Sequence, residues 1–146
     1  MELEELYRDI ILDHNRTPRN KRQLDDADIA NHQKNPVCGD EINIQIVLDG
    51  DQIDVAFFFG QGCSISQASA SILTDVLKGK TLDQARAIAA GFHELMNGSE
   101  PNNIDDLGDL VALQGVAHYP VRIKCAVLAC DTLDEGVIDW LNKHQI

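Results

Sequence analysis

Three of the four cysteines stand where the chain can present a thiol for chemistry. Cys38 lies in a stretch rich in turn-forming residues, Cys63 follows the glycine-rich residues 60–62, and Cys125 comes close to the expected start of the last helix. We expect the backbone at these positions to favour exposure over burial. The three residues are therefore candidate metal ligands or nucleophiles, and ordinary buried cysteines are the alternative.

A carboxylate completes a possible ligand set. Asp40 lies two residues after Cys38 and shares its face if this segment is extended. A hairpin expected just downstream brings the entry to its first strand beside the exit of its second, and hence Cys38 beside Cys63. Three thiolates and one carboxylate suit tetrahedral Zn²⁺ and can also hold iron. Bound metal keeps thiols deprotonated, and a carboxylate, as the weaker ligand, should loosen the site.

The spacing of these residues matches no common zinc-binding pattern. The sequence contains no Cys-x-x-Cys pair, and the long intervals between the three cysteines fit no finger or ribbon. Cys130 lies five residues after Cys125, which turns it to another side of the same helix. We therefore expect Cys130 to be a small core residue rather than a ligand.

Hydrophobic periodicity predicts the elements that position these residues. Strict alternation over residues 42–48 and 53–59 predicts a β-hairpin around the turn Asp49-Gly50-Asp51. Helical spacing predicts helices over residues 2–14, 64–77, 81–96, 104–117 and 121–143, with capping boxes at Ser64–Gln67 and Thr81–Gln84. The order predicts an α+β fold in which a short antiparallel β-sheet packs against several helices. We expect a single domain over residues 1–146.

Composition excludes several classes of function. The formal net charge of −12 argues against binding to nucleic acid or to an anionic membrane. No apolar run is long enough to span a bilayer, and the acidic N-terminus is unlike a signal peptide. We therefore expect a cytoplasmic protein. One third of the basic residues lie in one short stretch, which forms either a solvated loop or a docking patch for an acidic partner: Arg16, Arg19, Lys21 and Arg22.

The chain resembles the U-type iron–sulfur cluster assembly proteins over nearly its whole length. The motifs that carry the resemblance are Asp13-His14-Asn15, Pro18-Arg19-Asn20, Asn35-Pro36-Val37-Cys38-Gly39-Asp40, Gly62-Cys63-Ser64-Ile65-Ser66-Gln67-Ala68 and Arg122-Ile123-Lys124-Cys125. The resemblance implies a SufE/NifU-like fold, with residues 1–146 forming one NifU-like N-terminal-type (IscU/SufU) domain.

Three departures separate two branches of that family. Lys124 stands where the scaffold branch has a histidine, the chaperone-binding motif of that branch is absent, and the interval between Cys63 and Cys125 is longer. These departures look like the SufU branch. That resemblance implies a zinc site at Cys38, Asp40, Cys63 and Cys125, and a sulfur acceptor that works with a SufS-type cysteine desulfurase and downstream iron–sulfur assembly proteins rather than as a stand-alone enzyme.

Residue roles carried over from the resemblance place the incoming persulfide on Cys38. Arg122, about one turn from Cys125, either steadies the thiolate or the incoming sulfur, or is a plain surface arginine. Two alternative functions remain open. The same ligands could assemble and transfer a [2Fe–2S] cluster as a scaffold, or they could form a structural zinc domain that serves only partner binding.

Overall fold

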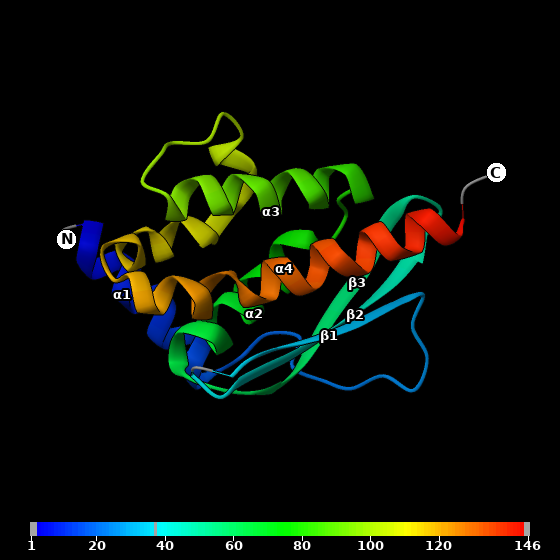
Figure 1. Cartoon of the computed structure of the whole chain (residues 1–146), viewed down its shortest axis with the longest axis horizontal. Helices are drawn as coiled ribbons and strands as arrows, with labels where there is room; N and C mark the ends of the chain where they lie inside the picture. The colour runs from blue at the N-terminus through cyan, green and yellow to red at the C-terminus, as the bar shows by residue number, and fades with distance from the viewer. Residues whose placement is uncertain (1–2, 37, 145–146) are drawn as a thin grey trace.

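The computed structural model describes residues 3–36 and 38–144, so that Val37 of the Cys38 motif lies outside the described residues. A three-stranded sheet and a group of helices form two layers (Figure 1). In chain order the elements are α1 (Leu3–Arg16), β1 (Ile29–Asn35), β2 (Asp40–Asp49), β3 (Gln52–Gln61), α2 (Ser64–Leu77), α3 (Leu82–Met96), the 3₁₀ helix η1 (Ile104–His118) and α4 (Pro120–Lys143). The predicted α+β class is confirmed.

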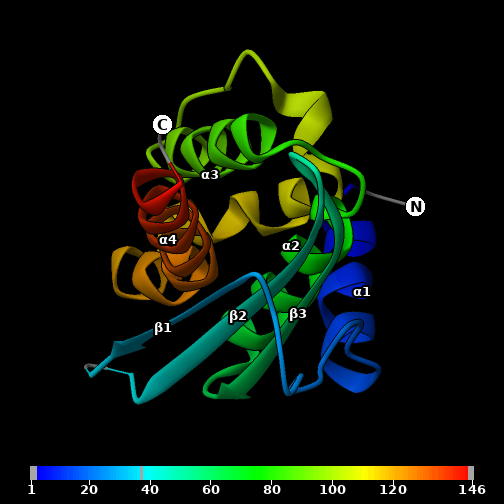
Figure 2. The same ribbon diagram turned by 90° about the vertical axis from the view of Figure 1, so that its right-hand side faces the viewer.

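The sheet is antiparallel, with strand order β1-β2-β3. Figure 2 shows the helices gathered on one face of it. Alternate residues of β2 point to that face and are buried, and Phe58 of β3 pairs with Ile44 of β2 in the same layer. The predicted hairpin is thus confirmed, and its buried face forms one hydrophobic cluster with the helices.

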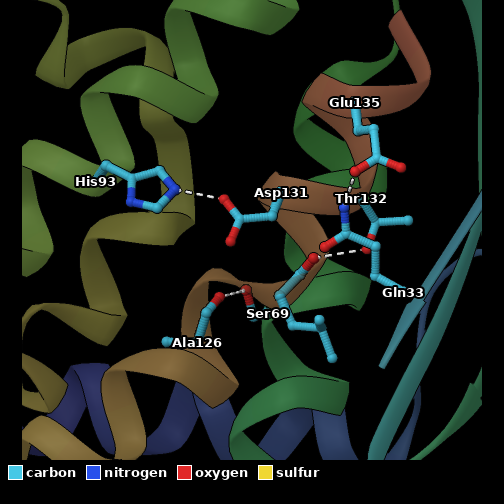
Figure 3. Close-up of polar contacts among 8 residues, drawn as sticks. Gln33, Ser69, His93, Ala126, Asp131, Thr132 and Glu135 are labelled. Carbon is cyan, nitrogen blue, oxygen red and sulfur yellow. Dashed lines mark hydrogen bonds and ion pairs between the residues drawn. The ribbon is translucent and has the colours of Figure 1, made fainter. Parts of the chain in front are cut away.

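Helix α2 lies inside this cluster and contacts α4 closely because it carries small residues on its buried face. The hydroxyl of Ser69 donates to the backbone oxygen of Ala126 at 2.6 Å, which ties α2 to α4 (Figure 3). At the exposed side of α4, Asp131 pairs with His93 of α3 at 2.6 Å. These contacts hold α4, and therefore Cys125, against the rest of the core.

The other face of the sheet is crossed by the segment that follows α1. Gln45 points to this face, accepts from the backbone N–H of Leu24 and donates to its carbonyl. Arg22 lies over the ring of Phe57, 5.8 Å from its centroid. The basic residues of this segment are therefore partly engaged with the fold, although Lys21 and Arg22 remain exposed.

The predicted and observed elements differ in three places. β1 escapes prediction because its inward positions include Asn31 and Gln33, which are satisfied only by bonds to α4. Residues 104–118 form a 3₁₀ helix interrupted at Gly108, where the backbone φ is 54°, rather than an α-helix. The capping box at Thr81 is present, whereas the one predicted at Ser64 is wrong, because Cys63 is the N-cap residue of α2.

Candidate metal centre

Four elements meet at one end of the sheet, where strands β1 and β3 finish and strand β2 begins. Cys38 lies in the turn between β1 and β2, and Asp40 is the first residue of β2. The antiparallel register sets Glu41 opposite Gln61, so the start of β2 lies beside the end of β3 and the adjoining Cys63. The first turns of helix α4 lie at the same end of the sheet and place Cys125 beside Cys38. The hairpin therefore brings the predicted residues together as its geometry requires.

The side chains converge on one small volume. One ligand atom each from Cys38, Asp40 and Cys125 lies within 4.8 Å of the others. The sulfur atoms of Cys38 and Cys125 are 3.1 Å apart, and Cys63 Sγ lies 3.9 Å from Asp40 Oδ2. Three soft sulfur donors and one carboxylate oxygen form a donor set that fits a tetrahedral metal ion such as zinc. Of the four residues that the resemblance implied, the structure gathers Cys38, Asp40 and Cys125 into one group, and Cys63 adjoins that group through its contact with Asp40.

Burial divides the three cysteines. Cys38 and Cys63 are half-buried, but Cys125 is completely buried, so the expected exposure of Cys125 is wrong. The reason is tertiary, because at this point α4 packs against β1, where Asn35 contacts Cys125, and against α2, where Ser69 binds the neighbouring Ala126. Burial, followed by hydrogen bonds with Cys38, Asp40 and Cys63, raises the pKa of the Cys125 thiol well above its ordinary value. Burial therefore favours the protonated thiol of Cys125 as long as no metal ion is bound to it.

The Asp40 carboxylate is held in a fixed orientation. Its side chain is 1 % exposed. Its Oδ1 atom accepts from the backbone N–H of Cys63 at 2.8 Å and from the hydroxyl of Ser66 at 3.1 Å. The other oxygen, Oδ2, faces the thiol of Cys63. One carboxylate oxygen is thus bound by the protein, and the other faces the cluster of sulfur atoms.

Sequence reasoning missed two polar residues at this site. Asn35, at the end of β1, is buried and directs its amide Nδ2 at Cys125 Sγ, 3.9 Å away. Ser66 is buried on α2, within the segment whose pattern predicts a capping box. The sequence indicates these two residues only by their proximity to the candidate ligands: Asn35 lies three residues before Cys38, and Ser66 lies three residues after Cys63.

Arg122 and Cys130 lie in contrasting surroundings. The guanidinium of Arg122 is exposed, and a hydrogen bond with Cys125 together with the charges of Cys63 and Cys125 raises its pKa. Cys130 is completely buried in the hydrophobic cluster, and burial raises the pKa of its thiol. The prediction that Cys130 is a small core residue is confirmed. Arg122 lies beside the cluster, with its positive charge close to the thiols.

No helix in the two described ranges is long and apolar enough to cross a bilayer.

The chain is similar to known proteins over most of its length. The model of the NifU-like N terminal domain matches residues 6–126. The zinc-dependent sulfurtransferase SufU of Bacillus subtilis is 47% identical over 135 residues, which cover 92% of this chain and 91% of that protein. The iron–sulfur cluster assembly scaffold protein IscU of Streptococcus pyogenes is 40% identical over 144 residues, which cover 99% and 90%.

Solved structures agree with these matches. A candidate iron–sulfur cluster assembly scaffold protein for the SUF system from Fervidobacterium islandicum has a TM-score of 0.84 at 30% identity and covers 93% of this chain and 99% of its own. An N-terminal NifU-like protein from Brucella abortus has a TM-score of 0.85 at 18% identity, covers 98% and 99%, and supports the fold alone. The predicted NifU-like fold is confirmed, and the chain belongs to the NifU-like N terminal domain family.

Proposed function

We propose that this protein is a zinc-dependent sulfurtransferase that accepts sulfur on Cys38 for iron–sulfur cluster assembly. The observation that carries the proposal is the group formed at one end of the sheet by the thiols of Cys38 and Cys125 and the carboxylate of Asp40, which the thiol of Cys63 adjoins. The same activity is named for the 47% identical relative from Bacillus subtilis. We further propose Cys38, Asp40, Cys63 and Cys125 as the zinc ligands.

Cys38 is the cysteine best placed to leave the cluster and meet a partner. Cys125 is fully buried on a helix, and the backbone N–H of Cys63 is bound to Asp40. Cys38 is half-buried and lies in a turn, where its backbone N–H donates to Asn35 O over a long 3.3 Å. Its neighbour Gly39 has a backbone φ of 69° and open space around it. A small change in this turn would expose the Cys38 sulfur.

The transfer step needs no oxidant beyond the donor persulfide. The Cys38 thiolate attacks the terminal sulfur of a persulfide on the donor protein, and a new sulfur–sulfur bond forms as the old one breaks. The donor cysteine leaves as a thiolate, and Cys38 carries the persulfide. Bound zinc keeps its ligand thiols deprotonated at neutral pH. Arg122, beside the thiols, stabilises their negative charge before and after the attack.

We propose a SufS-type cysteine desulfurase as the sulfur donor and iron–sulfur assembly proteins as the destination. Next to Arg122 the surface is apolar, since Tyr119 and Val121 are 65% and 66% exposed. A groove lined partly by Ile65, Tyr119 and Arg122 opens beside the site. Exposed apolar side chains around a reactive centre are typical of a protein-docking surface. Free thiols 3.1 Å apart also favour a reducing compartment, for which we propose the cytoplasm.

A scaffold for a [2Fe–2S] cluster is the second candidate function. The same donor set can hold iron, and the 40% identical relative from Streptococcus pyogenes is named a scaffold. Lys124 argues against this role, because it precedes Cys125, is exposed and offers a cation where a histidine would offer a ligand. The two functions share the ligands and differ in the cargo.

We also propose that residues 1–146 act as one domain, because one hydrophobic cluster includes strands and helices from β1 to α4.

Sulfur uptake by single-cysteine variants tests the proposed function. The zinc-loaded protein is incubated with a cysteine desulfurase and cysteine, and intact-mass spectrometry measures the gain of one sulfur atom. Cys38→Ala should abolish the gain, whereas Cys130→Ala, which alters a buried cysteine away from the cluster, should leave it unchanged. Normal sulfur uptake by Cys38→Ala would contradict the proposal. Stoichiometric iron and acid-labile sulfide in anaerobically purified protein would favour the scaffold.

A further inference from the structure

We infer that Ser66 is a positioning residue that holds the Asp40 carboxylate so that only its Oδ2 atom reaches the metal. The inference rests on the proposed metal centre and deepens it. It concerns how tightly, and through which oxygen, the one non-sulfur ligand binds.

The carboxylate lies in a cradle built at the start of α2. The hydroxyl of Ser66 is 3.1 Å from Asp40 Oδ1 and also 3.1 Å from the carbonyl oxygen of Cys63. A serine has one hydroxyl hydrogen, and an ionised carboxylate accepts it more strongly than a neutral carbonyl does. Together with the Cys63 N–H, this hydroxyl fills the accepting positions of Oδ1.

Gly62 completes the cradle by having no side chain. Its backbone φ is 156°, and a Cβ atom there would overlap both Asp40 Oδ1 and the hydroxyl of Ser66. The carboxylate therefore occupies the space that any other residue at position 62 would fill. Such a close approach is the circumstance in which a glycine is required.

The cradle has a direct consequence for metal binding. Because Oδ1 is held by two donors, the N–H of the N-cap residue Cys63 and the Ser66 hydroxyl of α2, the carboxylate offers Oδ2 alone and binds through one oxygen. It is also held ready in that orientation, so that little side-chain entropy is lost when metal binds. Ser66 thus acts on the metal through Asp40, without touching the metal itself.

A double-mutant cycle on zinc affinity tests this inference. Zinc dissociation constants are measured by competition with a chromophoric chelator for the wild type, Ser66→Ala, Asp40→Ala and the double variant. We expect Ser66→Ala to weaken zinc binding about tenfold, the lower end of the effect known for residues that orient metal ligands. In the Asp40→Ala background the same substitution should change the affinity less than about twofold, because the group it positions is gone.

Ser69→Ala is the matched control. Ser69 is a buried serine one turn further along α2, and its hydroxyl donates to Ala126 rather than to Asp40 (Figure 3). Unfolding of the metal-free proteins by urea measures any general loss of stability. We expect both serine variants to lose comparable stability, and only Ser66→Ala to lose zinc affinity.

Three results would overturn the inference: wild-type zinc affinity in Ser66→Ala, an equal loss in Ser69→Ala, or a persistent tenfold loss when Asp40 is already absent. A wild-type chain that binds no zinc would overturn it as well. The proposed function is tested separately by the sulfur gain on Cys38. If the affinity pattern holds but the wild type gains no sulfur, the sulfurtransferase proposal fails while the positioning role of Ser66 stands.

Discussion

Replacing Asn35 by aspartate should disable the metal centre while leaving the size of the side chain almost unchanged. The amide nitrogen of Asn35 lies 3.9 Å from Cys125 Sγ and directs its hydrogen at the sulfur. In Asn35→Asp an oxygen with negative charge takes that place. The new carboxylate would also stand opposite Asp40, its partner in the β1–β2 register.

The magnitude follows from this distance. Two unit charges about 4 Å apart repel by about 4 kcal/mol at an effective dielectric constant near 20, which corresponds to about a thousandfold in affinity. Protonating the new carboxylate at pH 7 would remove this repulsion but costs a similar amount, about 4 kcal/mol. Protonation therefore does not restore the affinity. A thiolate that shares its charge with zinc repels less, so we expect zinc affinity to fall between about 100-fold and 1000-fold.

Asn35→Ala provides the comparison that separates electrostatics from packing. This variant only removes a weak hydrogen bond to sulfur, worth about 1 kcal/mol or about fivefold in affinity. It also removes more buried volume than Asn35→Asp does. The loss of stability that comes from the cavity in the metal-free protein should therefore be larger for Asn35→Ala. Chelator competition measures the zinc affinity, and urea unfolding measures the stability of the metal-free protein. If Asn35→Asp binds zinc as tightly as Asn35→Ala, the electrostatic argument is refuted.

Further predictions concern the core, the pH dependence and the exposed arginine. Phe58→Ala should lower the free energy of unfolding by about 3–5 kcal/mol, measured in urea, because the ring is completely buried. A hydrogen bond to Asp131 raises the pKa of His93 above 6.5, so its stabilisation is present below that pH and is lost as the pH rises through the raised value. His93→Gln should therefore cost more stability at acidic than at alkaline pH. Burial lowers the pKa of His14, so the folded state favours the neutral ring, and His14→Gln should reduce the loss of stability as the pH falls below 6.5. Arg122→Gln should slow sulfur uptake about fivefold, the effect of one hydrogen bond, with little change in zinc affinity.

Much of the fold could be predicted because its signals are local. The alternation in β2 and β3 survives in the sequence as a period of two, and the helical segments as a period near 3.6. The hairpin alone places Cys38 and Asp40 near Cys63, since antiparallel pairing joins the entry of one strand to the exit of the next. β1 could not be predicted, because its inward polar residues, such as Gln33, find their partners on α4 about a hundred residues later.

The sequence by itself determined the candidate ligands that we propose, namely Cys38, Asp40, Cys63 and Cys125, and the candidate arginine beside them, Arg122. Only the tertiary structure decided how each of them can act. It buries Cys125 completely and Cys38 only in part, directs Asn35 at a sulfur atom, and binds one oxygen of Asp40 to Ser66. The physical reason is that burial and hydrogen bonding depend on contacts between elements far apart in the chain. A residue type reveals which ligand is available, whereas packing decides its protonation, orientation and access.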